Sequence, residues 1–205
     1  MDKLRLRFEK TGRAVWISHL DLMRTLQRGF SRAGISLAYS EGFNPHPLMS
    51  IALPLSVGME SVCEILDVKI EGKFDAEQLN LCLPEGIRVL EAYRSEQKAS
   101  EIRWLEISGE TVNADADGLN RFFAQDSIVI SKKTKRGVSD TDIRPMIREI
   151  RFEENRMHAL ISAQNPTLNP NNLLDAVSQL QSELLPERVS FRREEIYDSS
   201  LEVFR

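Results

Sequence analysis

Cysteine and histidine are scarce in this sequence of 205 residues, which contains two cysteines and three histidines. Cys63 and Cys82 do not form a Cys-x-x-Cys pair, and two thiols cannot hold a zinc ion or an iron–sulfur cluster without further ligands. The histidines are dispersed along the chain, which argues against a histidine-rich metal site. We therefore expect no metal and no cofactor in this chain, and we interpret both cysteines as small buried side chains.

Long apolar runs and an excess of positive charge are also missing. No run approaches the roughly 20 apolar residues that a membrane-spanning helix needs. Residues 1–5 open directly into a charged alternating segment, unlike a signal peptide. Because the formal net charge is −4, any affinity for nucleic acid has to be local. We expect a cytoplasmic protein without a membrane partner.

The common phosphate-binding and metal-binding motifs are absent as well. The sequence contains no Gly-x-x-x-x-Gly-Lys, no Gly-x-Gly-x-x-Gly and no His-Glu-x-x-His. Nucleotide-binding, dinucleotide-binding and zinc-protease functions therefore have no support from motifs.

The first half of the sequence predicts the element order β-α-β-β-α-β. Leu4, Leu6 and Phe8 alternate with charged residues, which is typical of a half-buried strand. Ser18 and Asp21 form a capping-box pattern before residues with helical spacing. We expect strands at residues 4–9, 35–40, 62–70 and 87–93, and helices at residues 19–33 and 75–83.

The second half repeats the same order after a polar linker at residues 95–100. The sequence thus predicts an α+β protein made of two tandem ferredoxin-like (βαββαβ) halves with antiparallel sheets, at residues 1–95 and 101–205. We expect strands at residues 104–107, 127–131, 156–163 and 188–193, and helices at residues 117–124 and 171–185.

Two histidines are candidates for proton transfer. His19 follows the expected helix cap, and His46 lies between two prolines in the loop at residues 41–47. If the two segments meet, the imidazoles could act as general bases. The alternative for His19 is that this segment only caps the helix. The alternative for His46 is a structural hydrogen bond within a rigid loop.

Arg24, Arg28 and Arg32 are spaced four residues apart and are expected to line one face of the first helix. Three guanidinium groups on one stripe suit bidentate recognition of phosphate or carboxylate. The alternative is a solvated helix face whose arginines pair with nearby acids such as Asp21. Tyr39, Phe43 and Asn44 are further candidate contact residues, because they lie in or just before the loop at residues 41–47 that carries His46.

A second basic run contains Lys132, Lys133, Lys135 and Arg136 and passes into a glycine turn. In an acidic protein, such a run could contact an RNA backbone or another anionic partner, although a plain surface hairpin explains it equally well. Asp142 and Arg144 follow, and we expect them close to that turn, where an ion pair would hold its shape.

Six segments carry a resemblance to a known family: residues 17–24, 32–34, 39–47 and 52–58 in the first half, and residues 132–137 and 142–145 in the second half. They resemble a bacterial domain-of-unknown-function family that is associated with radical-SAM enzymes of the cobalamin-binding type. The resemblance implies a radical-SAM protein as partner. It also implies that an iron–sulfur cluster and S-adenosylmethionine belong to that partner, because this chain lacks a Cys-x-x-x-Cys-x-x-Cys motif.

The hypothesis that these observations favour is an accessory module that binds RNA or a ribonucleoprotein and works with a radical-SAM enzyme. The basic side chains would contact phosphates, and Phe43 and His46 would contact a base or the partner. Two alternatives stay open: a metal-independent RNA-processing enzyme that uses His46 or His19, and a purely protein-binding adaptor.

Overall fold

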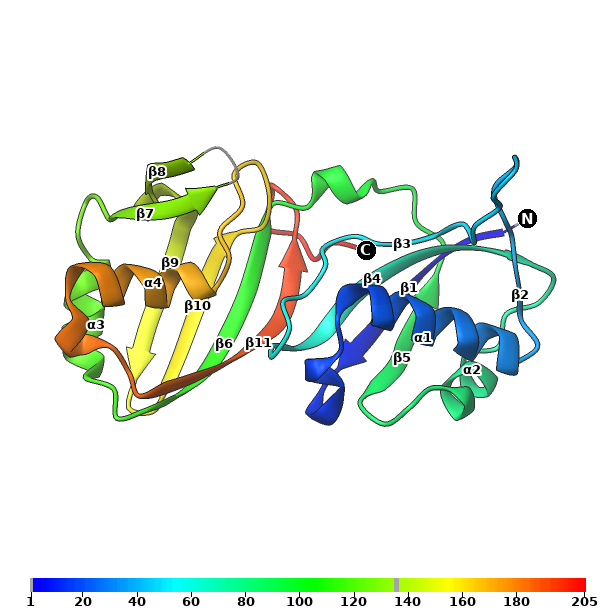
Figure 1. Ribbon diagram of the computed structural model, residues 1–205, viewed down its shortest axis with the longest axis horizontal. Helices are drawn as coiled ribbons and strands as arrows, with labels where there is room; N and C mark the ends of the chain where they lie inside the picture. Colours follow the sequence, from blue (N-terminus) through cyan, green and yellow to red (C-terminus); the bar gives the residue numbers. More distant parts are fainter. Residues whose placement is uncertain (1, 135–136) are drawn as a thin grey trace. The chain divides into compact units, whose positions relative to one another are not determined.

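The computed structural model describes residues 2–134 and 137–205 (Figure 1). The chain divides into two compact units. Unit 1 comprises the residues up to Ala99 together with Arg205, and unit 2 comprises Ser100–Phe204. Both units combine helices with antiparallel strands, so the expected α+β class is confirmed.

Unit 1 is built on three long antiparallel strands in the order β5-β1-β4, and β4 also pairs with the short strands β2 and β3. Two helices, α1 and α2, connect these strands. The bounds are β1 Asp2–Lys10, η1 Gly12–Trp16, α1 His19–Arg32, β2 Ser36–Leu37, β3 Met49–Ile51, β4 Glu60–Glu71, α2 Ala76–Cys82 and β5 Ile87–Tyr93.

The alternation in β1 decides which face of the unit 1 sheet the helices cover. Leu6 and Phe8 are fully buried in one cluster with Leu26 and Phe30 of α1 and Leu79 of α2. Successive residues of a strand point to opposite faces. The charged residues that alternate with them therefore point to the face that neither helix covers.

The start of α1 follows the expected cap. Ser18 is extended, and its hydroxyl oxygen accepts a hydrogen bond of 3.2 Å from the backbone N–H of Asp21. This bond satisfies one of the free N–H groups in the first turn, and it confirms the helix start that the Ser18–Asp21 pattern predicts. α1 ends at Arg32, shortly before Gly34, which has a φ of 67°.

Unit 2 has four antiparallel strands in the order β11-β6-β10-β9 and a separate hairpin of β7 and β8. Two helices connect the strands. The bounds are η2 Ala99–Glu101, β6 Trp104–Val112, α3 Ala116–Phe123, β7 Val129–Thr134, β8 Gly137–Asp142, η3 Arg144–Met146, β9 Ile147–Glu153, β10 Arg156–Ser162, α4 Asn171–Leu180, η4 Ser182–Leu184 and β11 Arg188–Tyr197.

The expectation that residues 127–131 form the second strand of the larger sheet in unit 2 is wrong. That segment is part of the β7–β8 hairpin, and β9 takes the place beside β10. β9 was not predicted because a register shift opposite Leu160 and Ile161 disturbs its alternation. β8 was not predicted because it reads Gly-Val-Ser-Asp-Thr-Asp and has almost no apolar residues.

Among the residues that the structure describes, no helix is both long and apolar enough to cross a membrane. Of the two cysteines, Cys63 is buried as expected, whereas Cys82 at the end of α2 is only half-buried.

Candidate functional site

A polar cleft of about 710 Å³ lies in unit 1 between α1 and the strand β2. Arg24, Gln27, Arg28 and Ser31 come from α1, at spacings that place side chains on one face of a helix. The other lining residues are those at 34–37, Tyr39, and Glu71 at the end of β4.

The two cleft arginines differ in their surroundings. Arg24 donates to Asp21 at 3.2 Å, but both side chains are more than half exposed, so this ion pair contributes little to stability. Arg28 is exposed and has no hydrogen-bond or ion-pair partner among the described residues. Asp21 pairs with Arg24 from outside the lining and Glu71 adds a carboxylate inside it, so Arg28 is the cleft cation without a competing partner among the described residues, and it suits an anionic ligand.

Arg32 does not join the other two arginines in the cleft. Its guanidinium donates to the backbone carbonyl of Cys82, the last residue of α2. Eight residues of an α-helix correspond to a rotation of about 80° beyond two full turns, so Arg32 leaves the stripe that Arg24 begins. A cation at a helix C-terminus also satisfies one of the free carbonyl groups there. Arg32 therefore links α1 to the end of α2 through this hydrogen bond.

A closed loop follows Tyr39 and carries most of the other candidate residues. Tyr39 pairs with Pro47 in an isolated β-bridge, and the backbone N–H of Ser40 donates to the carbonyl of His46 at 2.9 Å. The Ser40 hydroxyl oxygen accepts from the His46 N–H at 3.1 Å and lies 2.9 Å from His46 Nδ1. These contacts close the loop at its neck, so His46 has the structural hydrogen bond that was one of the two alternatives.

The tip of this loop is fully solvent-exposed. Phe43 has a relative exposure of 112%, which marks an aromatic ring without packing partners, and the neighbouring Asn44 is exposed as well. Gly42 has a φ of 118°, a backbone conformation that residues other than glycine rarely adopt. The loop therefore presents an unpacked aromatic ring on a closed neck.

His19 and His46 are not brought together. His19 is the first residue of α1, whereas His46 belongs to the loop between β2 and β3, and these two segments lie at opposite ends of unit 1 in Figure 1. His19 is half-buried, and its Nδ1 atom is buried without a hydrogen-bond partner among the described residues. A joint proton-transfer site of the two histidines is therefore not formed.

The second basic run lies in unit 2, on the β7–β8 hairpin. Lys132 pairs with Ser139 and Lys133 with Val138 in the hairpin register, while Lys135 and Arg136 lie outside the described residues. Lys132 is half-buried, and burial lowers the pKa of its ammonium group, although the nearby Asp175 acts in the opposite direction. Lys132 is thus partly withdrawn from solvent.

Asp142 and Arg144 are not beside the turn of this hairpin, as expected from the sequence, but at its other end. Asp142 pairs with Val129 there, and hydrogen bonds from the backbone N–H groups of Ile128 and Arg144 lower the pKa of its carboxyl. The Arg144 guanidinium donates to the carbonyls of Gln125 and Ile147 at 3.1 and 2.7 Å. Arg144 therefore stabilises the backbone at the base of the hairpin.

Several residues of the cleft were not predicted from the sequence. Gln27 and Ser31 lie three and seven residues after Arg24, and this helical spacing was the available signal. Ser36 and Glu71 had no such signal, because their proximity depends on the pairing of β2 with β4. No cluster of three or more metal-binding side chains occurs within residues 2–134 and 137–205.

The comparisons with known proteins give a family match without a known activity. A family model described as an uncharacterized protein conserved in bacteria (DUF2344) matches residues 3–173. A search of curated proteins finds no match. A solved structure of an unknown protein from Galdieria sulphuraria is similar at 9% identity, with a TM-score of 0.27, over 93% of this chain and 97% of that one. Because the family match spans well over half of the sequence, this chain belongs to the bacterial DUF2344 family.

Proposed function

We propose that this protein is a cytoplasmic accessory module that binds RNA, alone or in a ribonucleoprotein, and works with a radical-SAM enzyme. The observation that carries the proposal is the cleft in which Arg24, Arg28 and Tyr39 meet beside the loop of Phe43. This arrangement combines cations for a phosphate backbone with exposed aromatic rings for bases.

The chemistry of the cleft walls supports a phosphate-bearing ligand. Guanidinium groups bind phosphate oxygens through two parallel hydrogen bonds, and Arg28 has no competing partner among the described residues. Gln27, Ser31 and Ser36 add neutral donors and acceptors. Glu71 accepts hydrogen bonds only, so it fits a ligand that also carries hydroxyl groups, such as the 2′-OH of RNA.

The loop of Phe43 supports single-stranded RNA in particular. An exposed aromatic ring can stack on an unpaired base, and each such contact contributes about 1–3 kcal/mol to binding. The loop neck that Ser40 and His46 close limits the conformations of the tip, so less entropy is lost when the ring stacks.

The radical-SAM partner is proposed from the resemblance described above. The residues that carry the resemblance include Arg24, Tyr39, Phe43 and His46, and these residues lie in the cleft and the loop. With two cysteines in the sequence, the iron–sulfur cluster and S-adenosylmethionine would be bound by the partner.

We further propose that the two units are ferredoxin-like copies of one βαββαβ pattern. Each unit supports this by its strand order, which is β5-β1-β4 with β2 and β3 beyond β4 in unit 1, and β11-β6-β10-β9 in unit 2. In both units the first and third strands of the pattern pair with each other, and all pairings are antiparallel. The β7–β8 hairpin would then be an insertion into the second copy.

Co-purification tests the proposed partnership. We expect the tagged chain, isolated from bacterial cells without oxygen, to retain RNA together with a protein that contains an iron–sulfur cluster. The measurements are nuclease-sensitive absorbance, iron content and mass spectrometry of the retained proteins. A chain that retains protein without RNA would support the adaptor alternative, and a chain that retains neither would contradict the proposal.

Replacing Phe43 by alanine tests the role of the loop. We expect the F43A variant to bind single-stranded RNA about tenfold more weakly, the effect of losing one stacked base. The thermal midpoint should stay unchanged because the ring is fully exposed. The salt dependence of binding should also stay unchanged, because no charge is removed.

The matched control for this variant is Leu81→Ala, which removes a side chain that is 82% exposed on α2 of the same unit. Fluorescence anisotropy with labelled oligouridylate compares the two variants. Equal RNA affinities of F43A, L81A and the wild-type chain would show that the loop takes no part in binding.

A further inference from the structure

A second hollow of about 320 Å³ lies in unit 1, at the β3 side of the sheet. Lys3 of β1 and Asp67 and Lys69 of β4 line it, together with His46 and Ser50 from the segment that runs into β3. Leu4 and Val68 pack on the face that the helices cover. Because neighbours in a strand alternate, the side chains of Lys3, Asp67 and Lys69 point to the uncovered face.

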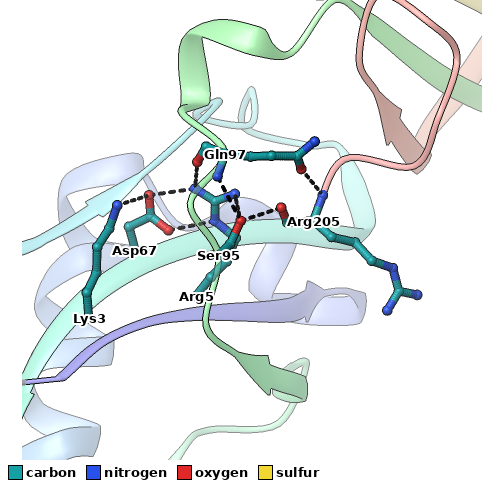
Figure 2. Close-up of polar contacts among 6 residues, drawn as sticks. All are labelled: Lys3, Arg5, Asp67, Ser95, Gln97 and Arg205. Carbon is teal, nitrogen blue, oxygen red and sulfur yellow. Dashed lines mark hydrogen bonds and ion pairs between the residues drawn. The ribbon is translucent and has the colours of Figure 1, made fainter.

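The carboxylate of Asp67 is held in place by a buried arginine. Arg5 is 1% exposed, and its Nε and Nη2 atoms donate to Asp67 Oδ1 and Oδ2 at 2.7 and 2.9 Å. The same guanidinium donates to Ser95 Oγ at 3.1 Å and to the carbonyl of Gln97 at 2.8 Å (Figure 2). Arg5 thus neutralises the negative charge of Asp67.

The remaining charge of the hollow is positive. Lys3 Nζ lies 4.0 Å from Asp67 Oδ2, with half of its side chain exposed, so this contact is weak and can be exchanged (Figure 2). Lys69 is exposed and has no ion-pair partner among the described residues. The hollow therefore presents two ammonium groups beside a neutralised carboxylate, a combination that attracts an anion and also accepts a hydrogen bond.

The hollow adjoins the cleft of Arg24 and Arg28 through the neck of the Phe43 loop. Tyr39 lines the cleft and pairs with Pro47, which lines the hollow. Lys69 of the hollow and Glu71 of the cleft are two residues apart on β4, so their side chains lie on the same face about 7 Å apart. The linings of the two sites thus meet at the Tyr39–Pro47 bridge and along the end of β4.

We infer that the hollow is a second phosphate subsite for the same RNA strand, with Lys3 and Lys69 as its phosphate contacts. The strand passes from Arg24 and Arg28 across the loop neck to Lys3 and Lys69, and the Asp67 carboxylate accepts a hydrogen bond from a base or ribose. This inference rests on the proposed RNA-binding function. It specifies an extended single strand as the ligand, because a compact anion could not occupy both sites.

The test compares two double variants, K3Q/K69Q and R24Q/R28Q, and the quadruple variant. Labelled oligouridylate is titrated at several salt concentrations by fluorescence anisotropy. Each phosphate contact on a single strand contributes about −0.7 to the slope of log affinity against log salt concentration. We expect each double variant to reduce the magnitude of the slope by about 1.4, and the quadruple variant by about 2.8.

The control is R13Q/R88Q, which removes two exposed arginines of unit 1 that line neither the cleft nor the hollow. Circular dichroism checks that each variant is folded. If the wild-type chain binds oligouridylate and K3Q/K69Q keeps the full slope, the second subsite is refuted and the proposed function stands. If the wild-type chain binds neither oligouridylate nor RNA from the cell, the proposed function itself is refuted.

Discussion

We expect the R24Q/R28Q variant to bind single-stranded RNA about a hundredfold more weakly than the wild-type chain. A hydrogen bond to a charged group contributes about 1.5–3 kcal/mol, and 1.4 kcal/mol corresponds to a tenfold change in affinity. Two lost phosphate contacts therefore account for about two powers of ten. Both side chains are exposed on α1, so the fold should be retained. Anisotropy titrations measure the affinity.

Arg32→Gln is the matched control, because it changes the same residue type on the same helix. The Arg32 guanidinium is bound to the carbonyl of Cys82 and does not line the cleft. We expect R32Q to leave RNA affinity within about twofold of wild type and to lower the stability of unit 1, since the end of α2 loses its cap. An R32Q variant that loses as much affinity as R24Q/R28Q would show that the cleft does not select the ligand.

The second large effect should follow from Asp67→Ala. This change removes the carboxylate that accepts two hydrogen bonds from the Arg5 guanidinium, which is 1% exposed. Removing one partner of a buried ion pair typically costs 3–5 kcal/mol, so we expect the free energy of unfolding of unit 1 to fall by about 3 kcal/mol. Hydrogen exchange of the β1 and β4 amides measures this change for unit 1 alone.

Two further variants show whether the loss of stability in D67A comes from breaking the Arg5–Asp67 ion pair. Arg5→Met combined with Asp67→Leu removes both charges and should recover most of the lost stability, as apolar replacement of buried ion pairs often does. Lys3→Ala should change the stability by less than about 1 kcal/mol, because the Lys3–Asp67 contact is 4.0 Å long and half of the lysine side chain is exposed. Equal losses in D67A and in the double replacement would contradict this explanation.

The elements with regular sequence patterns could be predicted, and the others could not. β1 and α1 have clear periods of two and of three to four residues, and the structure places them close to the expected residues. β3 has only three residues, too few for an alternating pattern. β8 is polar, and β9 contains a register shift, so neither carries the expected apolar signal.

Only those parts of the candidate site that depend on spacing along the chain could be predicted from the sequence. Arg24 and Arg28 were found because helical spacing alone places them together. Helical spacing already turns Arg32 about 80° away from Arg24, but the partner of Arg32 at the end of α2 depends on the packing of α2 against α1, which local spacing does not contain. The Arg5–Asp67 pair joins residues 62 positions apart, and it depends on the register of β1 against β4.

The closed neck at Ser40 and His46 has a consequence for how ligand preference can change in this family. The five tip residues, 41–45, are all exposed and lie outside the hydrogen bonds that join the loop to β4. Apart from Gly42, whose φ of 118° favours glycine, their identity and even their number can therefore vary without a penalty to the core. The scaffold would accept a transplanted tip from a relative, and the specificity of recognition would be transferred with that short segment.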